Sequence, residues 1–464
     1  MIRKADTICA VSTPAGIGGI AVIRMSGDKS IAIASICLTD NKGRRIDLKD
    51  HKATFCRFVA DGKLQDEVVA TLFAAPHSYT GEDVIELTCH GSIYVQQKLM
   101  LCLINSGARM AEAGEFTQRA FLNGKLNLSQ AEAVADLIES RSEAAHSLAI
   151  SQMRGSYAKE LELLRQELID TTALLELELD FSDEDLEFVN RKKLTEMIDA
   201  LAEKTKYLID SFQAGNAIKN GVPVAIAGHP NTGKSTLLNA LVGDDRAIVS
   251  DIAGTTRDTI EERFTIDGIE FRLIDTAGIR DTNDSIEQAG ILRSFRAMKE
   301  AAITLYITDV SSIDADEQLS QIVGDKEIAP KDIILIRNKI DKLSQKESLT
   351  ILTSKTINGK EVTVIALSAK EGINMDTLRN VLVEKARKGY SKEAVLLTNT
   401  RHYEALTKMC NALEEVKKGM EVQLTPDLLV IDLRDALYHL GSITGKVAAD
   451  EILSSVFSRF CIGK

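Results

Sequence analysis

The chain has 464 residues and a formal net charge of −12, with a pI near 5.3. This is about three times the length of a typical single domain, so we expect two or three domains. Hydrophobic residues make up 44% and charged residues 27%, which excludes a disordered or collagen-like chain. The excess of acidic residues disfavours a protein that holds nucleic acid by its overall charge.

Apolar runs and cysteines predict a cytoplasmic protein that does not enter a membrane. No run of about 18 apolar residues occurs, and Asp6, Pro14 and several glycines interrupt the region where a signal peptide needs an unbroken apolar run. The seven cysteines include no C-x-x-C pair, so we expect neither a disulfide framework nor a thiolate zinc site. All but Cys461 are predicted to be core residues in a reducing compartment.

Residues 1–123 are predicted to form an α+β domain. Short runs rich in β-branched residues, bounded by glycine or polar residues, indicate strands at Ile20–Ile23, Val68–Phe73 and Val84–Leu87.

Residues 124–219 are predicted to be helical. No proline occurs between residues 77 and 222, and an interior proline costs a helix about 3 kcal/mol. Ser129 and Glu132 match the S-x-x-E capping box at a helix start. A second long helix is indicated by leucines on one face, namely Leu161, Leu164, Leu168, Leu175 and Leu179.

Residues 220–384 alternate apolar strands with helix patterns, which is typical of a doubly wound, largely parallel sheet with helices on both faces. The predicted strands are Val222–Ala227, Glu270–Ile274, Ile303–Asp309, Asp332–Arg337 and Val362–Leu367.

Residues 385–464 return to helical spacing. Apolar stripes occur within Leu428–Leu440 and at Ala405, Met409, Leu413 and Val416. The simplest architecture inserts the α/β block into a discontinuous helical domain.

The first strand of the α/β block leads into a P-loop pattern. Residues 228–235 read Gly-His-Pro-Asn-Thr-Gly-Lys-Ser and fit G-x-x-x-x-G-K-[ST] between a predicted strand and a helix. In such a loop, backbone N–H groups surround phosphate oxygens, Lys234 neutralises phosphate charge and Ser235 offers a hydroxyl to Mg²⁺. The alternative, a simple glycine-rich turn, is disfavoured by the flanking strand and helix.

Three later motifs each follow a predicted strand, at the edge where α/β sheets bind ligands. Residues 275–278, Asp-Thr-Ala-Gly, provide a carboxylate for the metal and a glycine N–H for a γ-phosphate. Residues 338–341 fit N-K-x-D, which resembles the guanine-reading motif of GTPases, with Asp341 accepting from the base. Residues 368–370, Ser-Ala-Lys, resemble the partner loop at the base's O6. Together with the P-loop, these motifs predict GTP.

Residues 248–258 are polar and contain glycine, which is typical of a switch loop, and Thr256 is the natural second hydroxyl for Mg²⁺. The alternative is a solvated loop with Asp258 as a cap. Ile279 and Arg280 follow Gly278, so the water-orienting Gln of Ras-type proteins is missing there. The expected GTP contacts are Asn231, Thr232, Gly233, Lys234, Ser235, Thr236, Ser250, Asp251, Ile252, Ala253, Gly254, Thr255, Thr256, Asp275, Thr276, Ala277, Gly278, Asn338, Lys339, Asp341, Ser368, Ala369 and Lys370.

Segments outside these motifs give a family resemblance. They are residues 13–19 (Thr-Pro-Ala-Gly-Ile-Gly-Gly), 79–86 (Tyr-Thr-Gly-Glu-Asp-Val-Ile-Glu), 114–125 (Gly-Glu-Phe-Thr-Gln-Arg-Ala-Phe-Leu-Asn-Gly-Lys) and 460–464 (Phe-Cys-Ile-Gly-Lys). These segments and the nucleotide motifs together resemble the tRNA-modification GTPase MnmE (TrmE) family, and the resemblance extends over essentially the whole chain. Ser92 departs from the family by replacing the second glycine of a His-Gly-Gly turn.

The resemblance implies a K⁺-stimulated GTP hydrolase. With the flavoprotein MnmG, it would install a 5-carboxymethylaminomethyl or aminomethyl group on the wobble uridine of certain tRNAs. It implies a homodimer formed through the N-terminal domain, which binds 5-formyl- or 5,10-methylene-tetrahydrofolate. By motif, the folate contacts would be Arg24, Glu86, Lys125 and Lys464, although without the family these charges read as ordinary surface pairs. Cys461 is a hypothetical nucleophile whose pKa Lys464 would lower.

The resemblance also implies that a K⁺ ion replaces an arginine finger. Its ligands would be Asn231, Ser250, the Ile252 carbonyl and Thr255, an all-oxygen set that suits a hard cation. Glu287 matches the family's water-orienting carboxylate, whereas without the family it reads as a first-turn helix acid.

Two other functions remain open at this point. A ribosome-assembly GTPase switch would share the nucleotide motifs, but it should append a basic RNA-binding module in place of this N-terminal domain and the Cys461 ending. Alternatively, the N-terminal domain serves only dimerisation and has lost folate.

Overall fold

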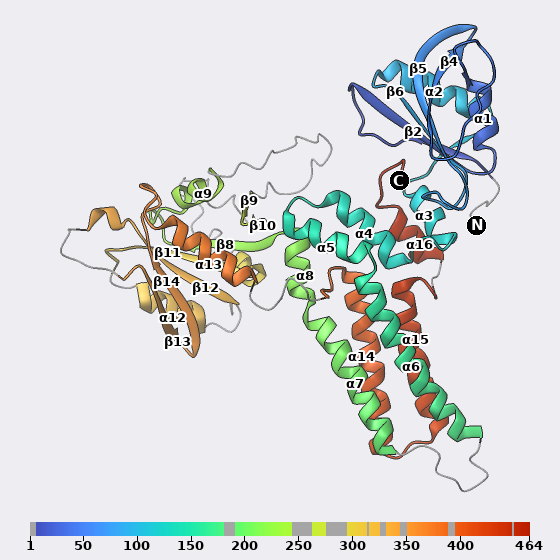
Figure 1. Ribbon diagram of the computed structural model, residues 1–464. Coiled ribbons are helices and arrows are strands. Elements are labelled where there is room, and N and C mark those ends of the chain that lie inside the picture. The colour runs from blue at the N-terminus through green and yellow to red at the C-terminus, as the bar shows by residue number, and fades with distance from the viewer. Residues whose placement is uncertain are drawn as a thin grey trace. The chain divides into compact units, whose positions relative to one another are not determined.

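Figure 1 shows the computed structural model, which describes residues 6–180, 191–243, 262–274, 295–312, 315–324, 331–343, 350–387, 395–447 and 450–464. The chain divides into two compact units. The first takes in residues 1–135, 152–189 and 419–464, and the second takes in residues 136–151 and 190–418. Each unit therefore combines segments that are far apart in the sequence.

The described part of the first unit contains a seven-stranded sheet, in the order β3-β4-β5-β6-β2-β1-β7. Its strands are β1 (Ile8–Val11), β2 (Ile20–Ser26), β3 (Leu38–Thr39), β4 (Ala53–Ala60), β5 (Lys63–Phe73), β6 (Val84–His90) and β7 (Arg109–Met110). All neighbours pair antiparallel except β1 and β7. The three predicted strands are confirmed, and each is longer than its apolar run.

Two helices, α1 (Ser30–Cys37) and α2 (Ile93–Asn105), pack on this sheet. They bury one face, where Ile23, Met25 and Leu87 meet Leu99 in a common core. A smaller cluster contains Phe116 with alternate β1 residues. Because side chains alternate along a strand, neighbours such as Cys9 and Ala10 enter different clusters.

Other helices described in the first unit include α3 (Glu115–Leu122), α6 (Ser156–Asp180), α15 (Pro426–Thr444) and α16 (Asp450–Phe457). The predicted leucine face of α6 is buried from Leu161 to Leu175. Helices α6 and α15 lie side by side (Figure 1). Arg434 within α15 pairs with Glu176 of α6 at 2.7 Å, and Lys446, just after α15, pairs with Glu162 of α6 at 2.6 Å. Sequence-distant helical segments thus form one packed layer.

The capping box predicted at Ser129 and Glu132 is wrong by two residues. Helix α4 spans Leu128–Glu139, so Asn127 is its N-cap. The Asn127 side chain accepts from the Gln130 N–H at 2.8 Å, and the Gln130 side chain accepts from the Asn127 N–H at 3.1 Å. Asn-x-x-Gln therefore forms the reciprocal box, while Ser129 and Glu132 are buried inside the helix.

The second unit also contains a seven-stranded sheet within the described residues, in the order β13-β14-β12-β11-β8-β10-β9. Its strands are β8 (Val222–Gly228), β9 (Arg263–Ile266), β10 (Ile269–Leu273), β11 (Ile303–Asp309), β12 (Asp332–Asn338), β13 (Leu352–Ile357) and β14 (Lys360–Ala366). The five inner strands run parallel, and β9 and β13 pair antiparallel at the edges. The largely parallel sheet is as predicted.

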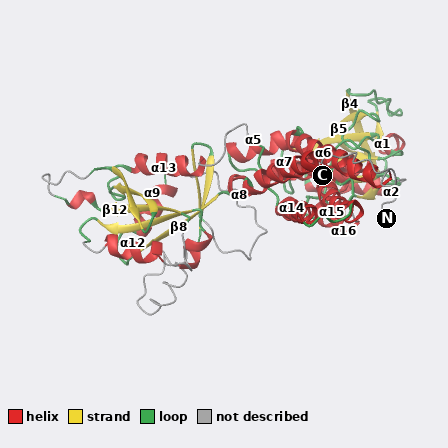
Figure 2. Ribbon diagram, turned by 90° about the horizontal axis from the view of Figure 1, so that it is seen from below, coloured by secondary structure: helices red, strands yellow, loops and turns green. Residues whose placement is uncertain are grey.

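Helices cover both faces of this sheet, with α13 and α12 on opposite sides (Figure 2). Helices described in this unit include α5 (Glu143–Met153), α7 (Arg191–Asp210), α8 (Phe212–Asn220), α9 (Lys234–Val242), α12 (Ala315–Gly324), α13 (Met375–Arg387) and α14 (Thr400–Glu421). Helix α7 precedes the sheet and α14 follows it, yet Lys417 pairs with Asp199 at 2.6 Å between them. Among the described residues, no helix is both long and apolar enough to cross a lipid bilayer.

Candidate nucleotide-binding site

The P-loop connects β8 to α9 at the carboxyl edge of the second sheet. Two of its glycines are required by close packing, because a Cβ atom at Gly228 would meet the Ile307 carbonyl and one at Gly233 would meet the Asn338 amide. Both glycines also have positive φ angles, 143° and 100°. The backbone of the loop can therefore come close to its neighbours only with glycine at these positions.

Lys234 begins α9, and its side chain lies over the loop. Its Nζ donates to the carbonyls of Gly228 at 2.7 Å and His229 at 2.8 Å. Burial lowers the pKa of this lysine, because desolvation disfavours its charged form. A phosphate group beside Nζ would supply a full counter-charge to this cation, whose two partners among the described residues are neutral carbonyls.

Asn338, at the end of β12, joins three loops. It is only 3% exposed, its Nδ2 donates to the Thr232 carbonyl at 2.9 Å, and its Oδ1 accepts from the Ala369 N–H at 3.0 Å. The N-K-x-D segment is thereby tied to the P-loop and to the Ser-Ala-Lys loop through one buried amide.

Lys339 reinforces the same junction. Its Nζ donates to the Asn231 carbonyl at 2.6 Å and pairs with the Asp309 carboxylate at 2.9 Å. The hydrogen bond from Lys339 holds the pKa of Asp309 down at about 2. Sequence reasoning missed Asp309, although it ends β11 at the same sheet edge as the motif residues, and that position was the available signal.

Asp341 and Ser368 meet at the end of the site expected to bind the base. The Ser368 hydroxyl donates to Asp341 Oδ1 at 2.6 Å, and this bond lowers the pKa of the Asp341 carboxyl. A carboxylate accepts through both of its oxygens, so Oδ2 can accept from a base while Oδ1 is held by Ser368. Lys370 is exposed and pairs with Glu371 at 3.1 Å.

Eleven of the 23 expected nucleotide contacts lie outside the described residues. These are Ser250, Asp251, Ile252, Ala253, Gly254, Thr255, Thr256, Asp275, Thr276, Ala277 and Gly278, together with the candidate catalytic Glu287. Asn231, Ser235 and Thr236, by contrast, lie exposed around the start of α9.

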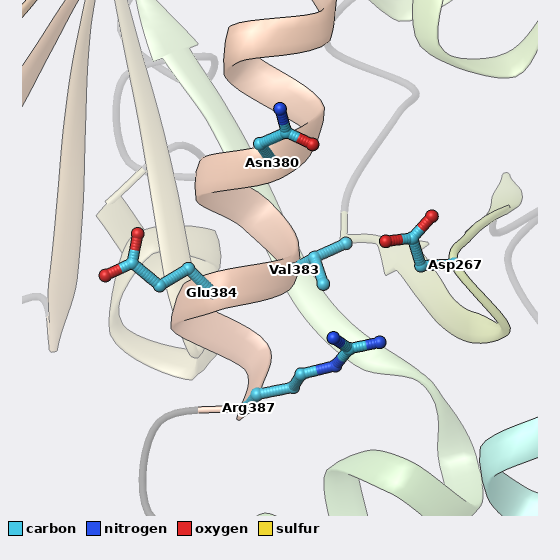
Figure 3. Close-up of a pocket in the computed structure, with 5 residues that line it drawn as sticks. All are labelled: Asp267, Asn380, Val383, Glu384 and Arg387. Atoms are coloured by element: carbon cyan, nitrogen blue, oxygen red, sulfur yellow. The ribbon is translucent and has the colours of Figure 1, made fainter.

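A pocket of about 510 Å³ lies elsewhere in this unit and is lined by Asp267, Asn380, Val383, Glu384 and Arg387 (Figure 3). Asp267 precedes the amino end of β10, which is parallel to β8. Since the P-loop follows the carboxyl end of β8, the pocket lies at the opposite edge of the sheet from the nucleotide motifs.

The candidate folate residues lie in the first unit. Arg24 on β2 and Glu86 on β6 are directly paired in the sheet, and their side chains form an ion pair at 2.8 Å. The Arg24 guanidinium also lies 5.6 Å from the Tyr79 ring centre and 5.8 Å from that of Phe116. These two aromatic residues were not predicted as site residues, although both lie within the motifs at 79–86 and 114–125.

The other candidate residues have separate contacts. Lys125 Nζ donates to the Pro76 carbonyl at 2.9 Å. Lys464 follows Gly463, whose carbonyl accepts from the Ser12 hydroxyl at 3.1 Å, so the C-terminal residues lie against the end of β1. Cys461 is exposed in this segment, and its carbonyl faces the Gly114 N–H at 3.4 Å.

The backbone conformation at Ser92 explains why a serine can replace the second glycine of the family's His-Gly-Gly turn. Ser92 is the N-cap of α2 with φ −74° and ψ 128°, an extended conformation open to any residue. The preceding Gly91 has no such freedom, because a Cβ atom there would meet the Gly18 carbonyl.

Comparison with known proteins agrees with these motifs. The model of the MnmE helical domain matches residues 128–461, and that of the GTP-binding protein TrmE N-terminus matches residues 7–125. The tRNA modification GTPases MnmE of Flavobacterium johnsoniae and Bacteroides fragilis are 47% and 48% identical to this chain. Each alignment covers 99% of both proteins. The chain therefore belongs to the tRNA modification GTPase MnmE family.

Proposed function

We propose that this chain binds and hydrolyses GTP at the carboxyl edge of the second sheet, in the service of tRNA wobble-uridine modification. The main support is the junction at Asn338, which ties the N-K-x-D segment to Thr232 of the P-loop and to Ala369 of the Ser-Ala-Lys loop. Loops at the ends of neighbouring parallel strands form the usual ligand site of such sheets.

Asp341 would select guanine. Its ionised carboxylate, held by the Ser368 hydroxyl, suits the N1–H and N2–H donors of that base. In Asp341→Asn, an N–H donor would face the base instead, so binding should shift from GTP to xanthosine triphosphate by at least about 10-fold. Asp376→Asn, which changes an exposed carboxylate on α13, is the matched control. Unchanged base preference in Asp341→Asn would exclude this role.

The phosphates would lie over the P-loop, with Lys234 beside them and the hydroxyls of Ser235 and Thr256 as ligands for Mg²⁺. The metal would supply charge neutralisation on the phosphoryl group. Lys234 already has a desolvated ammonium aimed at the loop. Lys234→Ala should abolish GTP hydrolysis in a phosphate-release assay, while the circular dichroism spectrum stays that of the wild type.

K⁺ would bind next to the P-loop through Asn231, Ser250, the Ile252 carbonyl and Thr255. The exposed side chain of Asn231 supports this assignment, since the Lys339 bond to its own carbonyl fixes the backbone beneath it. Replacing NaCl by KCl at constant ionic strength should raise hydrolysis by about 10-fold or more. Asn231→Ala should lose this response, and Asn239→Ala, which changes an exposed asparagine on α9, should keep it.

Glu287 would orient the attacking water.

The first unit would bind a 5-formyl- or 5,10-methylene-tetrahydrofolate. Arg24, Lys125 and Lys464 suit the folate carboxylates, and Glu86 suits N–H donors of the pterin. The donor set fits, because Arg24 combines an ion pair with two flanking aromatic rings that offer flat apolar surface. Calorimetry with 5-formyl-tetrahydrofolate should give binding heat for the wild type and none for Arg24→Ala. No heat with the wild type would favour a domain that serves only dimerisation.

The biological output would be modification of the wobble uridine by a homodimer acting with MnmG in the cytoplasm. Nucleoside analysis of tRNA from cells lacking this gene should show loss of the 5-carboxymethylaminomethyl or aminomethyl group, restored by the wild-type gene. Persistence of the group without a redundant enzyme would instead favour a ribosome-assembly switch.

Cys461→Ser should lose modification and retain GTP hydrolysis if the exposed thiol is the nucleophile.

A further inference from the structure

Two cysteines of the first unit lie in direct contact, although they are 65 positions apart in the sequence. Cys37 is the last residue of α1, and Cys102 lies in the second half of α2. Their Sγ atoms are 2.7 Å apart, and the Ser106 hydroxyl lies 3.5 Å from Cys37 Sγ. A disulfide bond needs the two sulfurs at about 2.0 Å, so a closure of less than ~1 Å separates contact from covalent bond.

The two thiols differ in exposure and in acidity. Cys37 is 1% exposed, whereas Cys102 is only half-buried, contrary to the expectation that all cysteines but Cys461 are core residues. The hydrogen bond between the two thiols lowers the pKa of Cys102 below the usual value of a thiol and raises the pKa of Cys37. Cys102 therefore combines access to solvent with thiolate character, the two properties that make a cysteine reactive.

The three cysteines on the strands of the first unit's sheet lack that combination. Cys9, Cys56 and Cys89 are buried, and desolvation raises the pKa of each. Such thiols are poor nucleophiles.

We propose that Cys37 and Cys102 form a peroxide-sensitive thiol pair that closes reversibly to a disulfide between α1 and α2. The Cys102 thiolate attacks a peroxide oxygen, the O–O bond breaks, and Cys102 becomes a sulfenic acid as one water leaves. Cys37 then loses its proton and attacks that sulfur, and the hydroxyl leaves as a second water. Two thiols and one hydrogen peroxide give one disulfide and two waters. The two thiols lose two electrons in total, and the peroxide gains them.

The test is peptide mapping of the full-length protein under non-reducing conditions after one equivalent of hydrogen peroxide. We expect a cross-linked peptide containing Cys37 and Cys102, 2 Da lighter than the sum of the reduced peptides and released by dithiothreitol. Its absence, with both thiols still free to react with iodoacetamide, would overturn the proposal. A different partner for Cys102 would overturn it as well.

Variants test the order of the two steps. Cys37→Ser should stop at a sulfenic acid on Cys102, trapped by dimedone with a mass increase at that residue, whereas Cys102→Ser should abolish oxidation at Cys37. Cys89→Ser removes a buried thiol on β6 and should leave the cross-link unchanged. Dimedone labelling of Cys37 in the Cys102→Ser protein would contradict the assignment of Cys102 as the attacking thiol.

Discussion

At the scale of single residues, the nucleotide site depends on a few side chains that satisfy each other's hydrogen bonds. Asn338 is the clearest case, since one buried amide serves as donor to Thr232 and acceptor from Ala369. Buried polar groups of this kind cost little while paired and a great deal when a partner is removed. The contribution of such a side chain is therefore best measured by replacing it with alanine and comparing the result with the same replacement at an exposed residue.

Asn338→Ala should weaken both stability and nucleotide binding. The change leaves the Thr232 carbonyl and the Ala369 N–H without their partner, at a cost of about 1–3 kcal/mol in the free energy of unfolding. Urea denaturation measures the first effect, and titration with a fluorescent GDP analogue measures the second. Asn380→Ala changes an exposed side chain on α13 at the opposite edge of the sheet. It should alter neither stability nor nucleotide binding. Equal behaviour of the two variants would contradict a joining role for Asn338.

The ion pair of Asp309 should make the free energy of unfolding depend on pH. The pKa of Asp309 is about 2 when paired with Lys339, below the value of about 3.9 in an unfolded chain. Because the folded value is the lower one, the pair's contribution is complete above about pH 5 and is lost as pH falls from about 4 towards 2.

Asp309→Asn should therefore lower the free energy of unfolding by about 1 kcal/mol at pH 7, a value discounted for the partial exposure of both side chains. Urea denaturation at a series of pH values should show the difference from wild type shrinking below pH 4. A difference that remains constant down to pH 3 would show that the ion pair is not its source.

The residue motifs were predictable where chemistry fixes both type and spacing, as in the P-loop and N-K-x-D segments. The contacts that join them were not. Lys339 meets Asp309 only because β11 and β12 are neighbours in the sheet, in register from Ile303 to Asp309. The local sequence does not indicate which strand ends become adjacent. Asp309 is therefore recognised as a partner of Lys339 only from the order of strands in the sheet.

At the scale of elements, hydrophobic patterns predicted the long and buried elements well. The five inner strands of the second sheet and the helices α6, α14 and α15 all follow from apolar periodicity. Edge and short strands did not, since β9 and β13 are half-exposed and mixed in composition, and β7 has two residues. Such strands are fixed by pairing with a neighbour, which a single-sequence pattern does not contain.

The start of α4 offers a test of element boundaries. Asn127→Ala should destabilise the protein by about 0.5–2 kcal/mol, because the Gln130 N–H loses its cap. Ser129→Ala should cost less, since the Ser129 hydroxyl only donates to the Asn127 side chain. Thermal unfolding followed by circular dichroism compares the two. A larger effect at Ser129 would restore the helix start that the sequence pattern first indicated.

At the scale of the whole molecule, the net charge of −12 is unevenly distributed. Residues 1–123 carry 14 basic and 13 acidic residues, and residues 385–464 carry 12 and 10. Residues 124–219 carry 11 and 19, and residues 220–384 carry 19 and 26. The acidity thus lies in the first helical stretch and the nucleotide-binding block, while the two terminal segments are close to neutral.

This distribution predicts weak tRNA binding by the isolated protein. Each phosphate contact that releases a counterion steepens the dependence of log K on log salt by about 0.7–0.9. Because no segment carries a large basic excess, we expect a slope equivalent to fewer than about three contacts, measured with NaCl at fixed K⁺ concentration. Adding MnmG, the flavoprotein proposed above as a partner, should steepen the slope, since phosphate contacts missing from this chain would then come from that protein. A steep slope for the isolated protein, equivalent to six or more contacts, would instead require a basic surface assembled from the near-neutral terminal segments.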